Sequence, residues 1–304
     1  MAFLIAVITA VLVCCDLGQA AVIIKADPSH PFSPWPSNVI TYRLGPDFVE
    51  EEITSLTTAM EQITKDTGNC IQFKRDVNVS DSSDVPFVLI RKDLGHNVMA
   101  RICSADPGFN ALLQNQRGKG QVAVMYGGGA DEGSCLGAGR ERDAMRLLVN
   151  ILGLQNEYLR QDREDPPTPS IIFAKADDQG RNDLIDDSLA GENIFGRVNT
   201  LNANNSQIIS PFDPLSITMV RSDRFAKSPL KKVFILQPGV EVGVKAALSV
   251  QDCAALIYMY GKYCPEKGSG SRPTCSTNDP YATGNKPEIS IGVIPAFDAN
   301  GNPI

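Results

Sequence analysis

The chain has 304 residues, of which 43% are hydrophobic and 21% charged, and its formal net charge is −7. This composition is typical of a globular protein with room for one large domain or two smaller lobes. The net charge is negative and the basic residues are dispersed, so the sequence argues against a nucleic-acid partner, which requires a concentrated basic surface.

The first twenty residues predict a signal peptide. The stretch from Met1 to Cys15 carries no charge and is almost wholly apolar, and small residues at Gly18 and Ala20 suit cleavage after Ala20. No Lys or Arg precedes the apolar run, which leaves an uncleaved anchor as the alternative. The run is short for a bilayer, and no other stretch could cross one. We therefore expect a secreted, extracellular protein with no membrane partner.

The expected elements begin with a strand at Val39–Leu44, where polar and apolar residues alternate. A helix follows, with Asp47 and Glu50 as its capping box and Gly68 at its end. The remaining expected elements are strands at Cys70–Phe73, Phe87–Ile90 and Gln121–Tyr126, and helices at about Glu141–Gln155 and after a Ser249/Asp252 cap. Strands and a long helix followed by loop-rich chain indicate an α+β domain.

A glycine-rich segment lies between the last expected strand and the second helix, from Gly127 to Gly139. Such a segment invites interpretation as a phosphate-binding loop. Its spacing matches neither G-x-G-x-x-G nor a P-loop, and Cys135 lies inside it. We predict a loop that carries a disulfide.

Eight cysteines are present, and Cys14 and Cys15 would leave with the signal peptide. The mature chain would keep six, namely Cys70, Cys103, Cys135, Cys253, Cys264 and Cys275. An even number in an exported protein implies three disulfides, in any of fifteen connectivities. Asn78 and Asn204 begin Asn-x-Ser sequences and are candidate glycosylation sites.

The segment after the second helix resembles a known motif. Arg160, Asp162, Arg163 and Asp165 look like the Arg-x-Asp-Arg-x-Asp segment that follows the HExxHxxGxxHE zinc motif of astacin-type (metzincin) zinc metalloproteases. Gly153 falls on the glycine of that motif. Further segments that resemble the family, in the same order, are Trp35–Tyr42, Thr67–Phe73, Cys103 with Cys135, Pro211–Ile217 and Leu248–Pro265.

This resemblance implies an astacin/metzincin-like, two-lobed α+β domain over residues 35–265. A mixed sheet plus helices would form the N-terminal lobe (about 35–156), and an irregular, disulfide-pinned lobe would follow (157–265). A short N-terminal segment (21–34) and a Gly/Pro/Asn-rich tail (266–304) would flank the domain. The resemblance also implies the disulfides Cys70–Cys264 and Cys103–Cys135, which leaves Cys253 with Cys275.

Aligned on Gly153, this chain replaces the family's zinc-site residues. The three ligand histidines and the general-base glutamate fall on Arg146, Asn150, Asn156 and Leu147, and the Met, His and Tyr of the family's methionine-turn fall on Thr218, Met219 and Val220. A hydrolytic zinc site needs about three protein ligands, an open position for water and a base. Arginine cannot be deprotonated and asparagine is a poor ligand, so we expect no zinc, no other cofactor and no catalytic residues. The two histidines, His30 and His96, are not expected to bind metal.

Two residues of this region carry further hypotheses. The resemblance implies that Glu157 clamps the mature amino terminus at Ala21, and the alternative is a solvated carboxylate. Arg146 and Asn150 are four residues apart and share a helix face. We expect the guanidinium of Arg146 to replace part of the metal's charge there. The alternative is a shifted helix with Arg146 exposed.

The function expected from these substitutions is not enzymatic. The sequence predicts a secreted, non-catalytic pseudopeptidase that binds an extracellular protein or peptide in the old cleft, in a decoy, matrix or coat role. The alternatives are a zinc metalloendopeptidase with an atypical site and a purely structural extracellular protein. The sequence predicts no oligomeric state.

Overall fold

A computed structural model describes most of the first half of the chain and shorter parts of the second. The described residues are 21–25, 31–79, 85–92, 103–110, 112, 120–128, 134–160, 171–173, 206–209, 212–222, 234–236, 242–264 and 275. The expected signal peptide, Asn204, His30 and His96 lie outside these ranges, as does the expected tail apart from Cys275. Asn78 is described and exposed.

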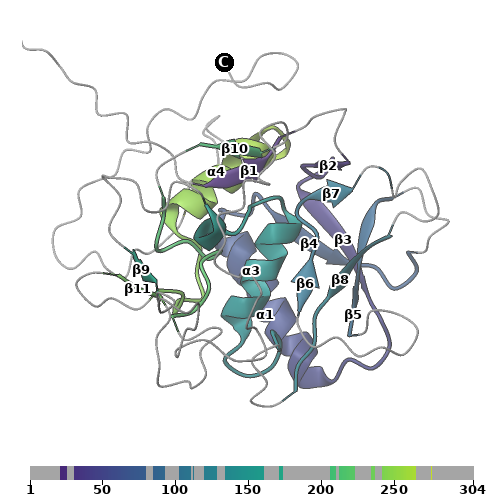
Figure 1. Ribbon diagram of the computed structural model, residues 1–304. Helices are drawn as coiled ribbons and strands as arrows, with labels where there is room; N and C mark the ends of the chain where they lie inside the picture. Colours follow the sequence, from purple (N-terminus) through teal and green to yellow (C-terminus); the bar gives the residue numbers. More distant parts are fainter. Residues whose placement is uncertain are drawn as a thin grey trace, which may run out of the picture.

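A five-stranded mixed sheet forms the right-hand part of the molecule in Figure 1. In spatial order its strands are β4 (Gln72–Arg75), β3 (Val39–Leu44), β5 (Phe87–Arg91), β8 (Gly120–Val124) and β6 (Ser104–Ala105). The first four strands are parallel to their neighbours, and β6 pairs antiparallel with β8, Ser104 opposite Val124. The short strand β6 is therefore one edge of the sheet.

Two helices, α1 (Glu50–Asp66) and α3 (Glu141–Ile151), pack against each other beside the sheet (Figure 1). Leu56, Ala59, Met60 and Ile63 form the buried face of α1, at the spacing that a core-facing helix requires. Helix α3 is buried over most of its surface, which makes it the central element of the fold. It contacts β6, so one end of the sheet and this helix are neighbours.

The segment before Trp35 is part of this structure. Strand β1 (Val22–Ile24) is buried and pairs antiparallel with β10 (Ser206–Ile208), and β2 (Phe32–Ser33) pairs with β7 (Phe109–Asn110). The amide of Ile24 also donates to the carbonyl of Gly153 at 3.0 Å. Residues 22–24 therefore join the end of α3 to a strand from the second half of the chain.

The second half of the described chain has few regular elements. It contains a short antiparallel pair, β9 (Ile171–Phe173) with β11 (Phe234–Leu236), and helix α4 (Val250–Tyr260), which runs into the 3-10 turn η3 (Gly261–Tyr263). Three disulfides join Cys70 to Cys264, Cys103 to Cys135 and Cys253 to Cys275. The first two are the pairs that the family resemblance implies, and the third is the pair that they leave. The Cys70–Cys264 disulfide connects the end of η3 to the turn before β4.

Several element boundaries differ from the sequence-based expectation. Helix α1 begins at Glu50 rather than after Asp47, because Asp47 has a φ of 76° and the carboxylate of Glu52 accepts from the amide of Val49. Helix α3 ends at Ile151 rather than near Gln155, because Gly153 turns the chain. The first expected strand and the Ser249 cap of α4 are where the sequence predicts them.

The glycine-rich segment is held by carboxylates. The amide of Gly127 donates to Glu52 Oε1 at 2.8 Å, and the amide of Ala138 donates to Glu51 Oε1 at 3.1 Å. Carboxylate oxygens of the protein thus accept hydrogen bonds from backbone amides that a phosphate-binding loop would offer to its ligand. The segment also carries the Cys103–Cys135 disulfide, as predicted.

Candidate functional site

The three positions that align with zinc ligands lie around one end of α3. Helix α3 carries Arg146 and Asn150, and the chain then returns so that Asn156 Oδ1 accepts from Arg146 Nη1 at 3.4 Å. Asn150 Nδ2 donates to the carbonyl of Leu154 at 2.7 Å, so this side chain bridges the turn that follows α3. We call these three residues the α3 face. The fold therefore brings together residues that the sequence alignment selected separately.

The turn between Asn150 and Asn156 depends on Gly153. Its φ is 106°, a region that residues with a Cβ atom avoid. The amides of Gly153 and Leu154 donate to the carbonyls of Asn150 and Val149, which cap the end of α3. Gly153 therefore has the chain-turning role that the resemblance implies.

A turn segment comprising residues 212–222 packs against α3, next to the α3 face. Arg142, one helical turn before Arg146, donates from Nη2 to the carbonyls of Ile217 and Met219. Thr218 Oγ1 accepts from the amide of Glu157 at 3.1 Å. Met219 is fully buried, so its side chain packs in the core. The segment is thereby fixed to α3 on one side and to Glu157 on the other.

Glu157 opens the 3-10 turn η1 (Glu157–Leu159) and belongs to a buried polar cluster. Its Oε1 accepts from Arg160 Nη1 at 2.6 Å and from the amide of Asp213 at 2.8 Å. The exposed fractions of Glu157 and Arg160 are 1% and 0%. Glu157 is therefore not solvated, and its ionic partner in the full-length chain is Arg160.

Two aspartates extend the cluster toward α4. Ser249 Oγ donates to Asp213 Oδ2, and Ser216 Oγ donates to Asp252 Oδ1, both at 2.6 Å. Asp252 Oδ2 accepts from the amides of Ile217 and Ser249. Asp252 therefore caps α4 and fixes the 212–222 segment at the same time.

Burial dominates the electrostatics of this cluster. It raises the pKa of Glu157 to about 8, although the Arg160 charge and the Asp213 amide act in the opposite direction. Burial and the neighbouring Asp252 raise the pKa of Asp213 to about 7, and burial also raises the pKa of Asp252. Three buried carboxyl groups lie in a cluster whose one ion pair is Glu157 with Arg160, so the raised pKa values mean that the cluster holds a proton near neutral pH.

The residues of the α3 face do not fit a zinc ion. Arg146 is a cation, and the amide groups of Asn150 and Asn156 are bonded within the protein. Leu147, at the position of the general base, is buried and has no proton to move. Val220, at the position of the family's tyrosine, is also buried and has no hydroxyl. In the described ranges, no three His, Cys, Asp or Glu side chains form a metal-binding group.

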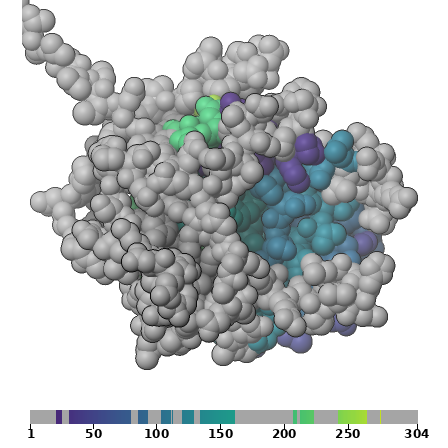
Figure 2. Space-filling view, in the orientation of Figure 1, coloured from purple at the N-terminus to yellow at the C-terminus, as the bar shows by residue number. Residues whose placement is uncertain are grey.

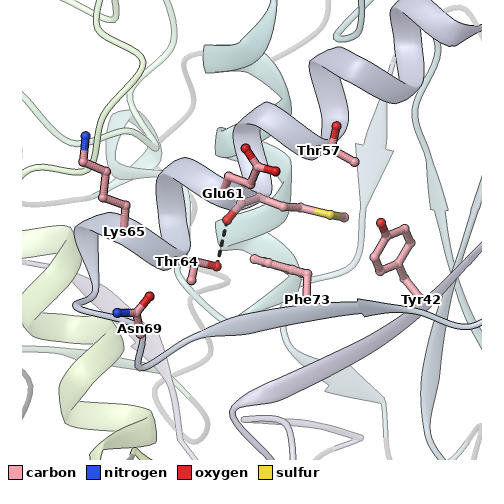
Figure 3. Close-up of a pocket in the computed structure, with 8 residues that line it drawn as sticks. Tyr42, Thr57, Glu61, Thr64, Lys65, Asn69 and Phe73 are labelled. Carbon is pink, nitrogen blue, oxygen red and sulfur yellow. Dashed lines mark hydrogen bonds between the residues drawn. The ribbon is translucent and has the colours of Figure 1, made fainter. Parts of the chain in front are cut away.

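A separate cavity of about 340 Å³ lies between α1 and strands β3 and β4 (Figure 3). Met60, Phe73 and Tyr42 form its apolar side, and Glu61 and Lys65 lie on α1 beside it. The hydroxyl of Thr64 is bonded to the carbonyl of Met60 at 3.0 Å. The cavity is at the β4 edge of the sheet, opposite β6, and its lining does not single out a ligand.

Comparison with solved structures identifies the fold. The chain is similar to high choriolytic enzyme 1 (HCE-1), a hatching enzyme zinc-protease from Oryzias latipes (Medaka fish), with 20% identity and a TM-score of 0.50 over 78% of this chain and 98% of that one. A structure of myroilysin matches with 15% identity and a TM-score of 0.42 over 79% of this chain and 98% of that one. No protein-family model and no curated protein sequence matches. The chain has an astacin-like zinc-protease fold, mixed α and β with disulfides.

This comparison corrects the prediction that the protein is not an enzyme. A solved structure of this fold, that of HCE-1, is a zinc-protease, and that finding goes against the expectation of an inactive protein. The substitutions at Arg146, Asn150 and Asn156 identify side chains that do not suit zinc. They do not demonstrate that the protein lacks activity.

The sequence selected part of this site and missed the rest. The family motif identified Arg146, Asn150, Asn156, Gly153 and Glu157, and the structure brings all five to the end of α3. The burial of Arg160 and Arg142 and the role of Asp252 beyond its helix cap were not predicted. The spacing of Arg142, four residues before Arg146, was the available signal for a shared face.

Proposed function

We propose that this protein binds polypeptides along strand β6, beside the α3 face. The supporting observation is the position of β6 as the antiparallel edge of the sheet in contact with α3. An edge strand presents backbone groups that an extended peptide can pair with, and neighbouring side chains then give specificity. Figure 2 shows a hollow in this face of the molecule. Residues in blue and teal, the colours of β6, β8 and α3, reach the surface there. Polypeptide is also what the zinc-protease of the same fold acts on.

Hydrogen exchange in the presence of a peptide mixture tests this proposal. Bound peptide should protect the amides around Ser104 and Ala105, because β6 would gain a strand partner. Strand β4, Gln72–Arg75, is a matched control, since it is the opposite edge of the same sheet. Protection at β4 alone, or the absence of peptide binding, would refute the proposal.

Hydrolysis of the bound polypeptide by an atypical site is the second candidate function. The fold shared with a zinc-protease favours it. Because the α3 face does not fit zinc, such a site would use other residues, and we derive no step through a metal. The purified protein and an active astacin-type protease would be incubated with the same peptide mixture, with and without a chelator. New peptide termini that the chelator suppresses would establish hydrolysis, and their absence over a day would exclude it for those substrates.

We also propose that the protein is exported and begins at Ala21 after signal cleavage. Three disulfides suit an oxidising compartment, and the chain is buried and strand-paired from the first residues after the expected cleavage point. Within the described ranges, none of the helices has the length and apolar character that crossing a bilayer demands. Amino-terminal sequencing of protein secreted from eukaryotic cells should start at Ala21. A mass shift on deglycosylation would test Asn78 and Asn204.

A further inference from the structure

Positive charge is concentrated at Arg146 of the α3 face and at Arg142, one helical turn before it. Helix α3 places Arg142 and Arg146 one turn apart on the same side. Arg142 is almost fully buried, and its Nη2 bonds the carbonyls of Ile217 and Met219. Its Nε and Nη1 have no hydrogen-bond partner among the described residues. Arg146, one turn later on α3, is half-buried and therefore reachable from solvent.

The carboxylates near these two arginines are engaged elsewhere. Asp143 pairs with Arg140, at 3.5 Å between Nη1 and Oδ2. The carboxylate of Asp252 accepts three hydrogen bonds from the 212–222 segment and the α4 cap. Among the described residues, no carboxylate lies within ion-pair distance of Arg142 or Arg146. Their charges are thus only partly compensated by the protein.

The pKa of Arg142 reflects its burial and the charges of both signs around it. Burial lowers the pKa of Arg142 to about 10; the charges of Asp143 and Asp252 act in the opposite direction, and those of Arg146 and Arg221 add to the lowering. A lowered arginine pKa means that the protonated form is disfavoured by its surroundings. An anion placed at Arg146 would relieve that unfavourable interaction.

We propose that Arg146, with the Arg142 charge behind it, is an anion site that receives a carboxylate of the bound polypeptide. The guanidinium of Arg146 uses one N–H in a long bond to Asn156, so its other N–H groups can form paired hydrogen bonds with a carboxylate. The carboxylate belongs either to an Asp or Glu side chain or to the carboxyl terminus of the peptide. This inference rests on the proposed function, because it names the ligand chemistry of the same surface.

Peptide affinity with a matched set of ligands tests the proposal. One peptide sequence would be prepared in three forms: with a free carboxyl terminus, with an amidated terminus and one internal Glu, and with an amidated terminus and Gln in place of Glu. Binding of each would be measured to the wild-type protein, to Arg146→Gln and to Lys74→Gln. Lys74 is an exposed residue of the opposite edge strand β4, so its variant makes the same change of charge far from the α3 face.

The expected result is a loss of tenfold or more in affinity for a carboxylate-bearing peptide in Arg146→Gln, because a charge-assisted pair is removed. The neutral peptide and the Lys74→Gln variant should change by less than about threefold. The form that loses affinity identifies the source of the carboxylate. Equal losses for charged and neutral peptides, or no loss at all, would overturn the anion site.

A second measurement separates this proposal from the proposed function. The Nε–Hε nuclear magnetic resonance signal of Arg146, assigned by its absence from Arg146→Gln, would be followed during titration with sodium acetate and with sodium chloride at equal ionic strength. If the signal shifts with acetate but not with chloride, and no peptide binds, then Arg146 binds carboxylates and the proposal of polypeptide binding is refuted. Peptide binding without either response at Arg146 would refute the anion site alone.

Discussion

Gly153 shows how one residue sets the geometry of the candidate site. It lies between the last turn of α3 and Asn156, and its φ of 106° sends the chain back toward Arg146. A Cβ atom at this position would be 3.5 Å from Met259 Sδ, which is an ordinary contact. The requirement for glycine is therefore conformational rather than steric.

Substitution of Gly153 by Ala should lower the free energy of unfolding by about 1–2 kcal/mol, because an alanine must adopt a positive φ. Urea denaturation measures this change. Gly45→Ala is the matched control, since Gly45 lacks a positive φ and its Cβ would meet Arg91 at 3.4 Å. We expect Gly45→Ala to change stability by less than about 0.5 kcal/mol. Equal effects of the two substitutions would show that the φ of Gly153 is not the cause.

At the scale of elements, the end of α3 is hydrogen-bonded to Trp35, which precedes β3, and to α4. Trp35 Nε1 donates to the carbonyl of Ile151 at 2.8 Å, and the hydroxyl of Tyr260 donates to the carbonyl of Leu152 at 2.6 Å. The same hydroxyl accepts from the amide of Trp35 at 3.2 Å. These contacts satisfy carbonyls that the helix itself leaves unpaired.

Removal of the Tyr260 hydroxyl should loosen this junction. Tyr260→Phe leaves the buried amide of Trp35 and carbonyl of Leu152 without that partner, so we expect a loss of about 1–3 kcal/mol in stability. Thermal or urea unfolding measures it. Tyr263→Phe makes the same change at an exposed tyrosine three residues later and should have almost no effect. A stability of Tyr260→Phe equal to that of wild type would contradict the assigned role.

The same junction shows what the sequence could and could not predict. Local signals located the strand Val39–Leu44 and the cap of α4, because alternation and capping are set by neighbouring residues. The family resemblance ordered the distant segments and implied the disulfide pairs. Hydrogen bonds between residues such as Trp35 and Tyr260 depend on tertiary packing, and no local pattern specifies them. The burial of Arg160 is of the same kind.

At the scale of the whole molecule, the buried polar cluster joins the two halves of the described chain. Glu157 and Arg160 follow α3, Asp213 belongs to the 212–222 segment, and Asp252 begins α4. The proton that this cluster holds near neutral pH is therefore linked to the packing of three elements. Stability should depend on pH through that proton.

The direction of this dependence follows from the raised pKa values. Glu157 and Asp213 have pKa values of about 8 and about 7 in the folded protein, above their ordinary values of 4.5 and 3.8. The folded state thus binds more protons than the unfolded state between about pH 4 and pH 8. The stabilisation from these groups is complete below the ordinary pKa values and is lost as the pH rises through 7 and 8.

Urea denaturation at a series of pH values should therefore show the free energy of unfolding falling by at least about 1 kcal/mol between pH 5.5 and 8.5. Glu157→Gln replaces a titrating group by a neutral one of the same shape, so its stability should fall less over this range. Glu61→Gln, at an exposed position on α1, should retain the wild-type slope. A wild-type stability that rises or stays constant from pH 5.5 to 8.5 would show that the cluster is fully ionised in the folded protein. In that case Arg160 and the surrounding amides would outweigh burial.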